Sequence, residues 1–490
     1  MGKTKKKEKQ LGWRTTKGQR AWYFLGRVGT YNLQAIIPAF MNVFLIFNGV
    51  DLAVAAAVTL VVKLIDAMDD MIFGFLVDKI DLKKSKLLSK IGGEGRYLPW
   101  LRCFMYFFPF AIFLFFLMPQ DMSSTAKVVW FALTYLLFDF TYTLVDVPIQ
   151  STLQTITEVP EERNHLITWG FVIVTFAAIA TNTLQTVLIS ESVGLSIRAV
   201  GIGCAVIYAL MMLPMPFKLK EQNFELQNVE KQVEEKYTLK EMFFAVKNNK
   251  PYLINILAQV IPAMLATGAG ISLFVNYYLY GSSTAMVVPS LVGMVLAVIC
   301  EALAPKLSNK FGNKKSLMAS CLVVTLCGFA TFIVGYKNFG VVVALLLVST
   351  GANGFVTMLR SYMCFQAIEY GKYKNGRDTT GIYNAINTFT GKVTSSVASS
   401  LGLAMLSFFS WTTVNAESFA DLAAQGVEQS ALALEGLWII NSLVPAIGGL
   451  LGLILVGFYG LNDGDAKLMG QCNCGEITRE ECESRLSKKY

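Results

Sequence analysis

The chain has 490 residues, of which 54% are hydrophobic and 16% charged, and its formal net charge is +8. Soluble globular proteins carry about 25% charged residues, so this composition, with a mean hydropathy of +0.50, excludes that class and indicates an all-α protein of the membrane. A bilayer core needs about 20 apolar residues per helix. We predict twelve transmembrane helices, over 22–48, 52–77, 98–118, 127–153, 165–190, 195–216, 251–280, 284–304, 316–336, 340–369, 379–409 and 431–461.

Residues 1–21 form a basic tail in front of the first predicted helix. A topology signal explains this tail more simply than a nucleic-acid contact, because a membrane span follows at once. The first apolar segment is too long for the apolar region of a signal peptide and lacks a small-residue cleavage site, so we interpret it as a helix. Arg27, Tyr31 and Gln34 align along one side of it.

Four ionisable residues interrupt the second apolar segment, 52–77. Lys63, Asp66, Asp69 and Asp70 fall within an arc of about 120° on one helical face. Charges at this depth are costly and usually mark a pathway for ions or substrates. Asp66 and Asp70, four residues apart, repel each other unless a cation, a proton or a basic side chain lies between them.

Basic residues also follow the second, sixth and eighth predicted helices, whereas the opposite side has only Lys127, Arg198 and Lys337 near helix ends. By the positive-inside rule, both termini are expected to be cytoplasmic. We therefore predict a multi-pass protein of the plasma or inner cell membrane.

The fourth predicted helix carries a second polar face. Tyr142, Thr143, Asp146 and Gln150 lie within an arc of about 100°, and Asp139 is close to the same face. For single Ser, Thr or Asn residues in such helices, buried hydrogen bonds that set helix packing are the simpler interpretation.

The second half of the chain repeats part of the first. Residues 76–85 align with 307–316 so that one Leu, three Lys and one Ser recur in register. The second and eighth helices are six helices apart, which predicts two six-helix bundles, 22–216 and 251–461. A linker over 217–250 joins them, and 462–490 form a cytoplasmic tail.

Polar residues also line helices of the second half. Asn353 and Arg360 share a face of the tenth helix, and the eleventh has the stripe Asn384, Thr388, Lys392, Ser395 and Ser399. Lys63 or Lys392 could neutralise one acid of the second helix, but the acids of the second and fourth helices outnumber the intramembrane bases by one. Carboxylates suit hard cations and crowded carboxylates hold protons, so Na⁺ and H⁺ both remain open. The remaining acceptors and donors fit sugar hydroxyls.

Several motifs together resemble those of the glycoside-pentoside-hexuronide:cation symporters, within the major facilitator superfamily. The similarity runs from Tyr23 to about Asn462. The motifs are Asp66-Ala67-Met68-Asp69-Asp70, Gly95-Arg96-Tyr97-Leu98-Pro99-Trp100, Asp146-Val147-Pro148, Glu369-Tyr370-Gly371-Lys372-Tyr373-Lys374-Asn375-Gly376-Arg377, and Lys392.

The resemblance implies the twelve-helix major facilitator fold and cation-coupled sugar or glycoside symport by alternating access. The resemblance implies that Asp66 and Asp70 bind the coupling cation, which is Na⁺ in a sodium-coupled carrier, with Thr143 nearby; we add Asp69 as a predicted ligand. It implies that Asp146 hydrogen-bonds sugar hydroxyls and that Lys392 is tied electrostatically to the cation site; we predict Tyr31, Asn32, Gln150, Lys392 and Arg360 as further sugar-binding residues. It also implies that the cytoplasmic loops after the second and tenth helices help to gate the carrier, and we predict Lys63, Arg96, Arg163, Glu369 and Arg377 as gating or electrostatic residues.

Three positions depart from the galactoside-carrying members: Tyr31 beside Asn32 replaces an aspartate, Gln150 a tryptophan and Phe171 an arginine. They disfavour galactoside recognition of the familiar kind. A carrier of the same fold with another cargo, such as a hexuronide, another organic anion or a lipid, stays open, as does an uncoupled exchanger. Arg27 and Arg360 could serve an anionic cargo.

An enzyme is the main alternative from another class. No H-E-x-x-H, Walker A or G-x-S-x-G arrangement stands out, and the single histidine, His165, begins the fifth helix, where an interfacial role is expected. Cys472, Cys474 and Cys482 do not match the usual zinc spacing. We expect no enzymatic activity, no cofactor beyond the coupling ion, no nucleic-acid partner, contacts with membrane lipid, and a monomeric functional unit.

Overall fold

The computed structural model describes residues 13–79, 86–93, 95–157, 159–221, 244, 247–376 and 380–488. Within these ranges the description includes the backbone but not the side chains of 67–79, 86–87, 89, 154, 160, 380–381 and 384–385. The side chains of Asp69, Asp70 and Asn384, and the whole of Arg377, therefore lie outside the described part of the chain.

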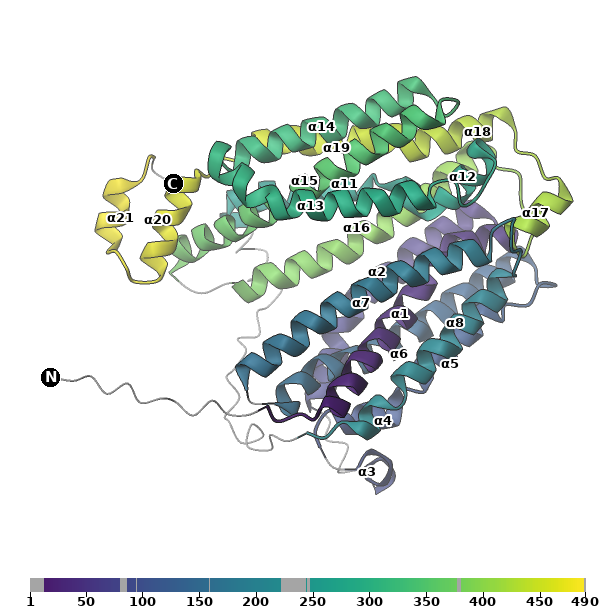
Figure 1. Cartoon of the computed structure of the whole chain (residues 1–490), viewed down its shortest axis with the longest axis horizontal. Helices are drawn as coiled ribbons and strands as arrows, with labels where there is room; N and C mark the ends of the chain where they lie inside the picture. Colours follow the sequence, from purple (N-terminus) through teal and green to yellow (C-terminus); the bar gives the residue numbers. More distant parts are fainter. Residues whose placement is uncertain are drawn as a thin grey trace. The chain divides into compact units, whose positions relative to one another are not determined.

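Helices account for nearly all the regular structure of the described residues (Figure 1). In the first half of the chain they are α1 (Lys17–Phe47), α2 (Leu52–Lys79), α3 (Lys86–Gly92), α4 (Leu98–Phe104), α5 (Phe107–Phe116), α6 (Ser124–Ile156), α7 (Pro160–Leu188), α8 (Ile197–Met212) and α9 (Met215–Lys218). The second half has α11 (Lys250–Met264), the 3₁₀ segment η3 (Thr267–Ile271), α12 (Ser272–Tyr280), α13 (Val287–Phe311), α14 (Asn313–Val334), α15 (Phe339–Asn375), α16 (Thr380–Phe408), α17 (Phe419–Gln425), α18 (Ala431–Trp438), the π segment η4 (Ile439–Leu443), α19 (Val444–Gly457), α20 (Asp463–Asn473) and α21 (Arg479–Arg485).

Ten helical passages among the described residues are long and apolar enough to cross a membrane. These ten overlap ten of the twelve predicted spans, and the prediction of an all-helical membrane fold is confirmed. The other two predicted spans correspond to the long helices α2 and α16. The sequence of α2 contains the charged cluster, and that of α16 contains Lys392 and a series of Ser and Thr residues.

Prolines explain two interruptions that the sequence prediction did not include. A proline ring clashes with the carbonyl four residues earlier and leaves it without its helical donor. Pro109 follows Met105 by four residues, and the chain turns there between α4 and α5. Pro445 follows Asn441 by four residues, and Asn441 lies in the π segment between α18 and α19.

The chain divides into two compact units. Unit 1 comprises Met1–Met41, Met68–Ile189 and Leu195–Gln232, and unit 2 comprises Asn42–Ala67, Ser190–Gly194 and Val233–Tyr490. Both α1 and α2 therefore change from one unit to the other part way along their length. The division into halves at 22–216 and 251–461 remains a prediction.

In unit 1, α5 packs on α6 and α8, and α4 packs on α6. In unit 2, α13 and α14 pack on α15, while α11 and α14 pack on α19. The core of unit 2 includes Leu359, Met363 and Tyr459, all nearly inaccessible to solvent.

The residues predicted as a tail form the helices α20 and α21, which lie beside the end of α15 (Figure 1). Asp463, at the start of α20, accepts hydrogen bonds from the Asn313 backbone N–H at 2.7 Å and the Gln366 amide at 2.9 Å. Met469 and Cys482 are fully buried in the same core as α15. The tail is thus packed against unit 2.

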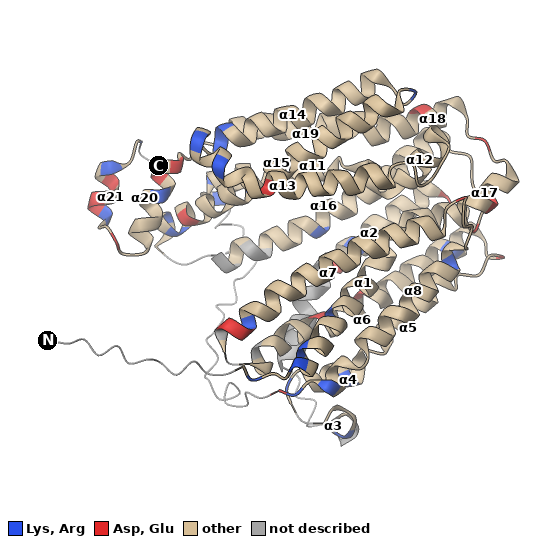
Figure 2. Cartoon of the chain, viewed as in Figure 1, with Lys and Arg blue, Asp and Glu red and all other residues tan. Residues whose placement is uncertain are grey.

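Charge is distributed unevenly along unit 2 (Figure 2). Lys and Arg gather at the end where α13 meets α14 and where α20 and α21 lie, mixed there with Asp and Glu, whereas α17 and α18 at the other end carry Asp and Glu. Such an asymmetry is typical of a membrane protein with a fixed orientation.

Candidate functional site

Asp66 of α2 forms an ion pair with Lys392 of α16. The Lys392 ammonium lies 2.7 Å from a carboxylate oxygen of Asp66, and the two side chains are 27% and 17% exposed. The ammonium also donates to the Asp66 backbone carbonyl at 3.3 Å. Lys63, only 8% exposed, lies one turn before Asp66 and interacts with its charge. Asp66 is thus next to two cationic side chains.

The serine hydroxyls that follow Lys392 donate to a backbone carbonyl of α16 or to α1. Ser395 and Ser396 both donate to the Lys392 backbone carbonyl, at 2.9 and 2.7 Å. Ser399 donates instead to Asn42 of α1 at 3.0 Å. Part of the predicted polar stripe of α16 therefore joins the end of α1 that belongs to unit 2.

Two residues of the polar face predicted on α6 contact each other directly. The Gln150 amide donates to the Asp146 carboxylate at 2.6 Å, across one helical turn. Thr143, 2% exposed, donates to the Asp139 backbone carbonyl at 3.3 Å. Asp139 is itself 3% exposed. Gln150 fixes the orientation of the Asp146 carboxylate.

A cavity of about 420 Å³ lies between α1, α6 and α7 in unit 1. Tyr31 and Gln150, both predicted to bind sugar, line it together with Phe171, whose position differs from the galactoside carriers. The other lining residues are Tyr23, Arg27, Leu153, Leu166, Ile167, Gly170, Val174 and Thr175.

Arg27 is the charged group of this cavity. Its guanidinium interacts electrostatically with the Tyr23 phenol, and among the described residues it makes no ion pair. Tyr23, Arg27 and Tyr31 follow one another at intervals of four residues and so share one face of α1. The predicted stripe of α1 already contained Arg27 and Tyr31, and the same spacing points to Tyr23.

The model of the family "MFS/sugar transport protein" matches residues 22–463, which is most of the chain. The chain belongs to this MFS sugar transport family. Its members are transporters, so the predicted transporter class is confirmed, as is the predicted multi-pass membrane protein.

Curated relatives of this family member match over most of their length. The isoprimeverose transporter of Lactiplantibacillus pentosus is 25% identical over 432 residues, which cover 86% of this chain and 84% of the relative. The glucuronide carrier protein homolog of Escherichia coli K12 is 23% identical over 465 residues, covering 93% and 94%. The raffinose carrier protein of Pediococcus pentosaceus is 23% identical over 414 residues, covering 79% and 62%.

Solved structures share the fold at low sequence identity. A bacterial homologue of the human lysosomal transporter Spinster aligns with a TM-score of 0.60 and 13% identity, over 94% of this chain and 99% of that chain. The nucleoside transporter NupG aligns with a TM-score of 0.59 and 13% identity, over 90% and 99%. These likenesses confirm the predicted major facilitator fold.

Two other predicted sugar-binding residues of this MFS transporter lie away from the cavity lining. The Asn32 side chain is inaccessible to solvent and donates to the Val28 carbonyl at 2.9 Å. Arg360 lies in unit 2 on α15, where Cys321 is an electrostatic neighbour. Their predicted contact with cargo stays a prediction.

Three of the predicted gating residues have partners among the described residues. The Arg163 guanidinium donates to the Thr157 carbonyl at 3.1 Å, and the Arg96 guanidinium stacks on Tyr97, 5.2 Å from the ring centre. Glu369 accepts a hydrogen bond from the Asn473 amide of α20 at 2.7 Å. No periodic signal indicated that the tail contacts Glu369.

In the motif that begins at Glu369, close packing leaves no room for a side chain at Gly371. The Tyr383 hydroxyl lies so close to Gly371 that any Cβ would overlap it. The Asn249 amide holds this hydroxyl at 2.9 Å and the Ala367 carbonyl at 2.6 Å. The arrangement ties α11, α15 and α16 together at one end of unit 2.

Proposed function

We propose that this protein is a cation-coupled symporter that carries a sugar or glycoside by alternating access. The observation that carries the proposal is the cavity of α1, α6 and α7, which brings Arg27, Tyr31 and Gln150 together with Asp146 held by Gln150. The family match supports a sugar as the cargo class.

The cavity chemistry suits a sugar. Hydroxyl groups need acceptors and donors, which Gln150, Tyr31 and Arg27 supply, while Phe171 and Val174 provide apolar surface for the ring carbons. The volume of about 420 Å³ lies within the range of about 300–1,000 Å³ that small-molecule sites occupy. Tyr31, Asp146 and Gln150 would bind the sugar, with Asn32, Lys392 and Arg360 as further predicted contacts.

The cation would bind at Asp66, with Asp69, Asp70 and Thr143 as further ligands. The Lys392 ammonium at 2.7 Å supports this role, because it supplies the positive charge that a bound Na⁺ or H⁺ would otherwise supply to Asp66. A cation that enters must compete with Lys392. When the cation displaces Lys392 from Asp66, the protein is expected to favour the conformation that binds sugar. Cation binding would then raise the affinity for sugar, which couples the two.

The remaining predictions form part of the same proposal. The two predicted six-helix halves rock around the central site, and Lys63, Arg96, Arg163, Glu369 and Arg377 contribute to gating. Both termini are cytoplasmic, as the uneven distribution of basic residues suggests, and the protein works as a monomer in the cell membrane.

A panel of sugars tests the cargo assignment. The purified protein in detergent is heated with each sugar, with or without Na⁺ and at several pH values, and the shift in unfolding temperature is recorded. At least one sugar is expected to raise that temperature, and Asp146→Asn is expected to abolish the rise. Glu435→Gln, at an exposed position on α18, is the matched control. A rise that Asp146→Asn leaves intact would contradict the proposed site.

One observation favours a second candidate, a sugar that carries an acidic group. Arg27 faces the cavity and pairs with no described carboxylate, and an unpaired intramembrane charge is costly unless a ligand completes it. A uronic acid should then stabilise the protein more than its neutral parent sugar, and Arg27→Gln should remove the difference. Equal stabilisation of the wild-type protein by both sugars would exclude this candidate.

A further inference from the structure

The loop between α7 and α8 joins a different unit from the helices that flank it. Residues Ser190–Gly194 belong to unit 2, whereas α7 up to its end and α8 belong to unit 1. A segment of five residues is short, so its covalent ends must pull on it whenever the flanking helices move against unit 2.

Glu191 anchors this loop to the connection between α12 and α13. Its carboxylate accepts hydrogen bonds from the Ser282 hydroxyl, from the Ser283 backbone N–H at 3.2 Å and from the Ser283 hydroxyl at 2.6 Å. Ser283 is itself fully buried, and its carbonyl accepts from Asn276 at 3.3 Å. Both carboxylate oxygens are therefore held by a fixed part of unit 2.

Backbone hydrogen bonds and a glycine determine the conformation of this loop. The Gly194 N–H donates to the Ser190 carbonyl at 2.8 Å, and Leu195 N–H donates to the Leu188 carbonyl at 3.0 Å. Gly194 has a φ of +73°, and a Cβ there would come within 2.9 Å of Ala420 of α17. Glycine meets both requirements, the left-handed backbone and the close approach.

The end of α1 and the start of α2 join unit 2 in the same way. The Ala416 N–H donates to the Phe47 carbonyl at 3.0 Å, and Asn48 forms an antiparallel bridge with Asn415. The Phe47 ring lies 5.3 Å from that of Phe274 and 5.1 Å from that of Phe419.

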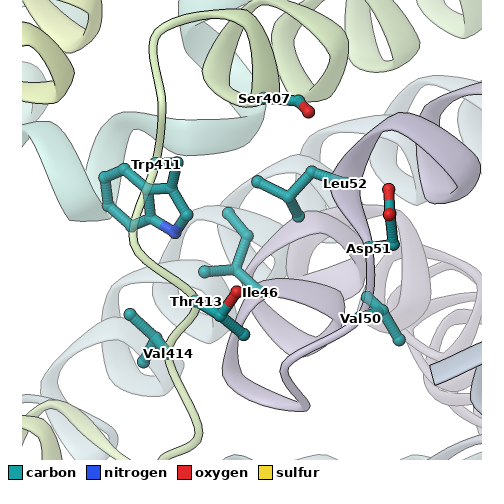
Figure 3. A pocket seen from close by; sticks show the side chains of 8 residues that line it. All are labelled: Ile46, Val50, Asp51, Leu52, Ser407, Trp411, Thr413 and Val414. Atoms are coloured by element: carbon teal, nitrogen blue, oxygen red, sulfur yellow. The ribbon is translucent and has the colours of Figure 1, made fainter. Parts of the chain in front are cut away.

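A small cavity of about 140 Å³ separates this corner from the end of α16 (Figure 3). Ile46, Leu52 and Trp411 turn toward it. Two separate segments whose neighbours belong to unit 1, 42–67 and 190–194, are thus bound to unit 2.

We propose that Glu191 is a gating residue, whose carboxylate latches the α7–α8 loop to Ser282 and Ser283 and must release them before the transporter opens at the end where this loop lies. The inference rests on the proposed alternating-access function. Hydroxyl and amide donors suit a reversible latch, because water can replace them one by one as the loop leaves. A buried ammonium partner would hold the carboxylate more strongly.

The charge of the latch persists at neutral pH. Burial acts to raise the pKa of Glu191, but the hydrogen bonds from Ser282 and Ser283 outweigh it and hold the pKa below the usual 4.5. Tyr277 of α12 also interacts with this charge. The latch therefore responds to loop movement rather than to physiological changes of pH.

Accessibility of Ile46, which is 1% exposed, reports on the latch. Ile46→Cys is introduced, and a membrane-impermeant maleimide is added to sealed vesicles of known orientation, with the parent protein and its nine cysteines as the blank. Each hydrogen bond to a charged group is worth about a factor of ten or more in an equilibrium, and Glu191→Ala removes those from Ser282 and Ser283, so it should speed labelling at least about tenfold. Glu191→Asp should recover part of the protection, and Glu428→Gln, an exposed control, should change nothing.

A cross-link gives a second, independent readout of the same corner, and partial recovery in Glu191→Asp separates release of the latch from misfolding. Paired residues of an antiparallel bridge have Cα atoms about 4.5–5.5 Å apart, within the range of about 4.4–6.8 Å that a disulfide spans, so Asn48→Cys with Asn415→Cys should form one. Glu191→Ala should slow its formation by a similar factor. Unchanged labelling and unchanged cross-linking in Glu191→Ala would refute the latch. If both change while no sugar binds or moves, the latch stands and the proposed cargo is wrong.

Discussion

Replacement of Lys392 by methionine tests the cation site most sharply, because it removes the ammonium and keeps most of the volume. The wild-type ammonium lies 2.7 Å from the Asp66 carboxylate. If a coupling ion competes with Lys392 for Asp66, then Lys392→Met should tighten cation binding and destabilise the cation-free protein, because Asp66 loses one of its two cationic neighbours.

The magnitude follows from the burial of the pair. Exposed ion pairs contribute about 0–1 kcal/mol, and removal of one partner of a buried pair costs about 3–5 kcal/mol. With side chains 27% and 17% exposed, this pair lies between those limits, at about 2 kcal/mol. At 1.4 kcal/mol per factor of ten, cation affinity should rise by up to about 30-fold.

The assay is the shift in unfolding temperature of the purified protein as Na⁺ is titrated at fixed pH, and again as pH is varied without Na⁺. Half-maximal stabilisation should move to a lower concentration of one of these cations. Lys337→Met, in the loop between α14 and α15, is the control. An unchanged titration midpoint in Lys392→Met, with a cation response still present, would refute competition at Asp66.

Three further outcomes are expected. Gly371→Ala should destabilise the protein by about 1–3 kcal/mol, the usual cost of overpacking, because its Cβ meets the Tyr383 hydroxyl; denaturant unfolding measures this. Asn473→Ala removes the donor to Glu369 and should cost about 1 kcal/mol, seen as faster proteolysis of the tail. For Glu191, the lowered pKa means that its contribution is complete above 4.5 and is lost as pH falls below it. The unfolding temperature of wild type minus that of Glu191→Gln should therefore be constant from pH 8 to about 5.5 and shrink in stronger acid.

The first two of these outcomes have matched control variants. Gly340→Ala lies in open space on the same helix as Gly371 and should be neutral or slightly stabilising. Lys467→Ala, exposed on α20, should leave proteolysis unchanged. A difference between wild type and Glu191→Gln that grows in acid would contradict the assigned pKa direction.

Hydropathy and motif spacing predicted much of the fold. Apolar segments gave the spans, and helical spacing placed Tyr142, Thr143, Asp146 and Gln150 on one face, where Gln150 does contact Asp146. Charge repulsion indicated that Asp66 needs a cationic neighbour, and Lys392 fills that place. These features depend on local periodicity or on a scarce charged residue.

Long-range contacts of single polar residues could not be predicted. Glu191 reaches Ser283 across 92 residues, and Glu221 accepts from the N–H groups of Tyr97 and Leu98, more than 120 residues away. A carboxylate that binds backbone N–H groups leaves no pattern in the sequence, because every residue except proline has that donor. The apolar lining of the cavity could not be predicted from the sequence either, because Leu153 and Val174 are of the same residue types as those that face lipid.

Gradient-driven accumulation of sugar tests the central claim most directly. Purified protein is reconstituted into liposomes, a Na⁺ or a proton gradient is imposed, and uptake of the radiolabelled sugar that stabilises the protein is followed. The account predicts accumulation above the external concentration with one of the gradients and its loss in Asp66→Asn. Equal uptake with and without either gradient, or full accumulation by Asp66→Asn, would contradict it.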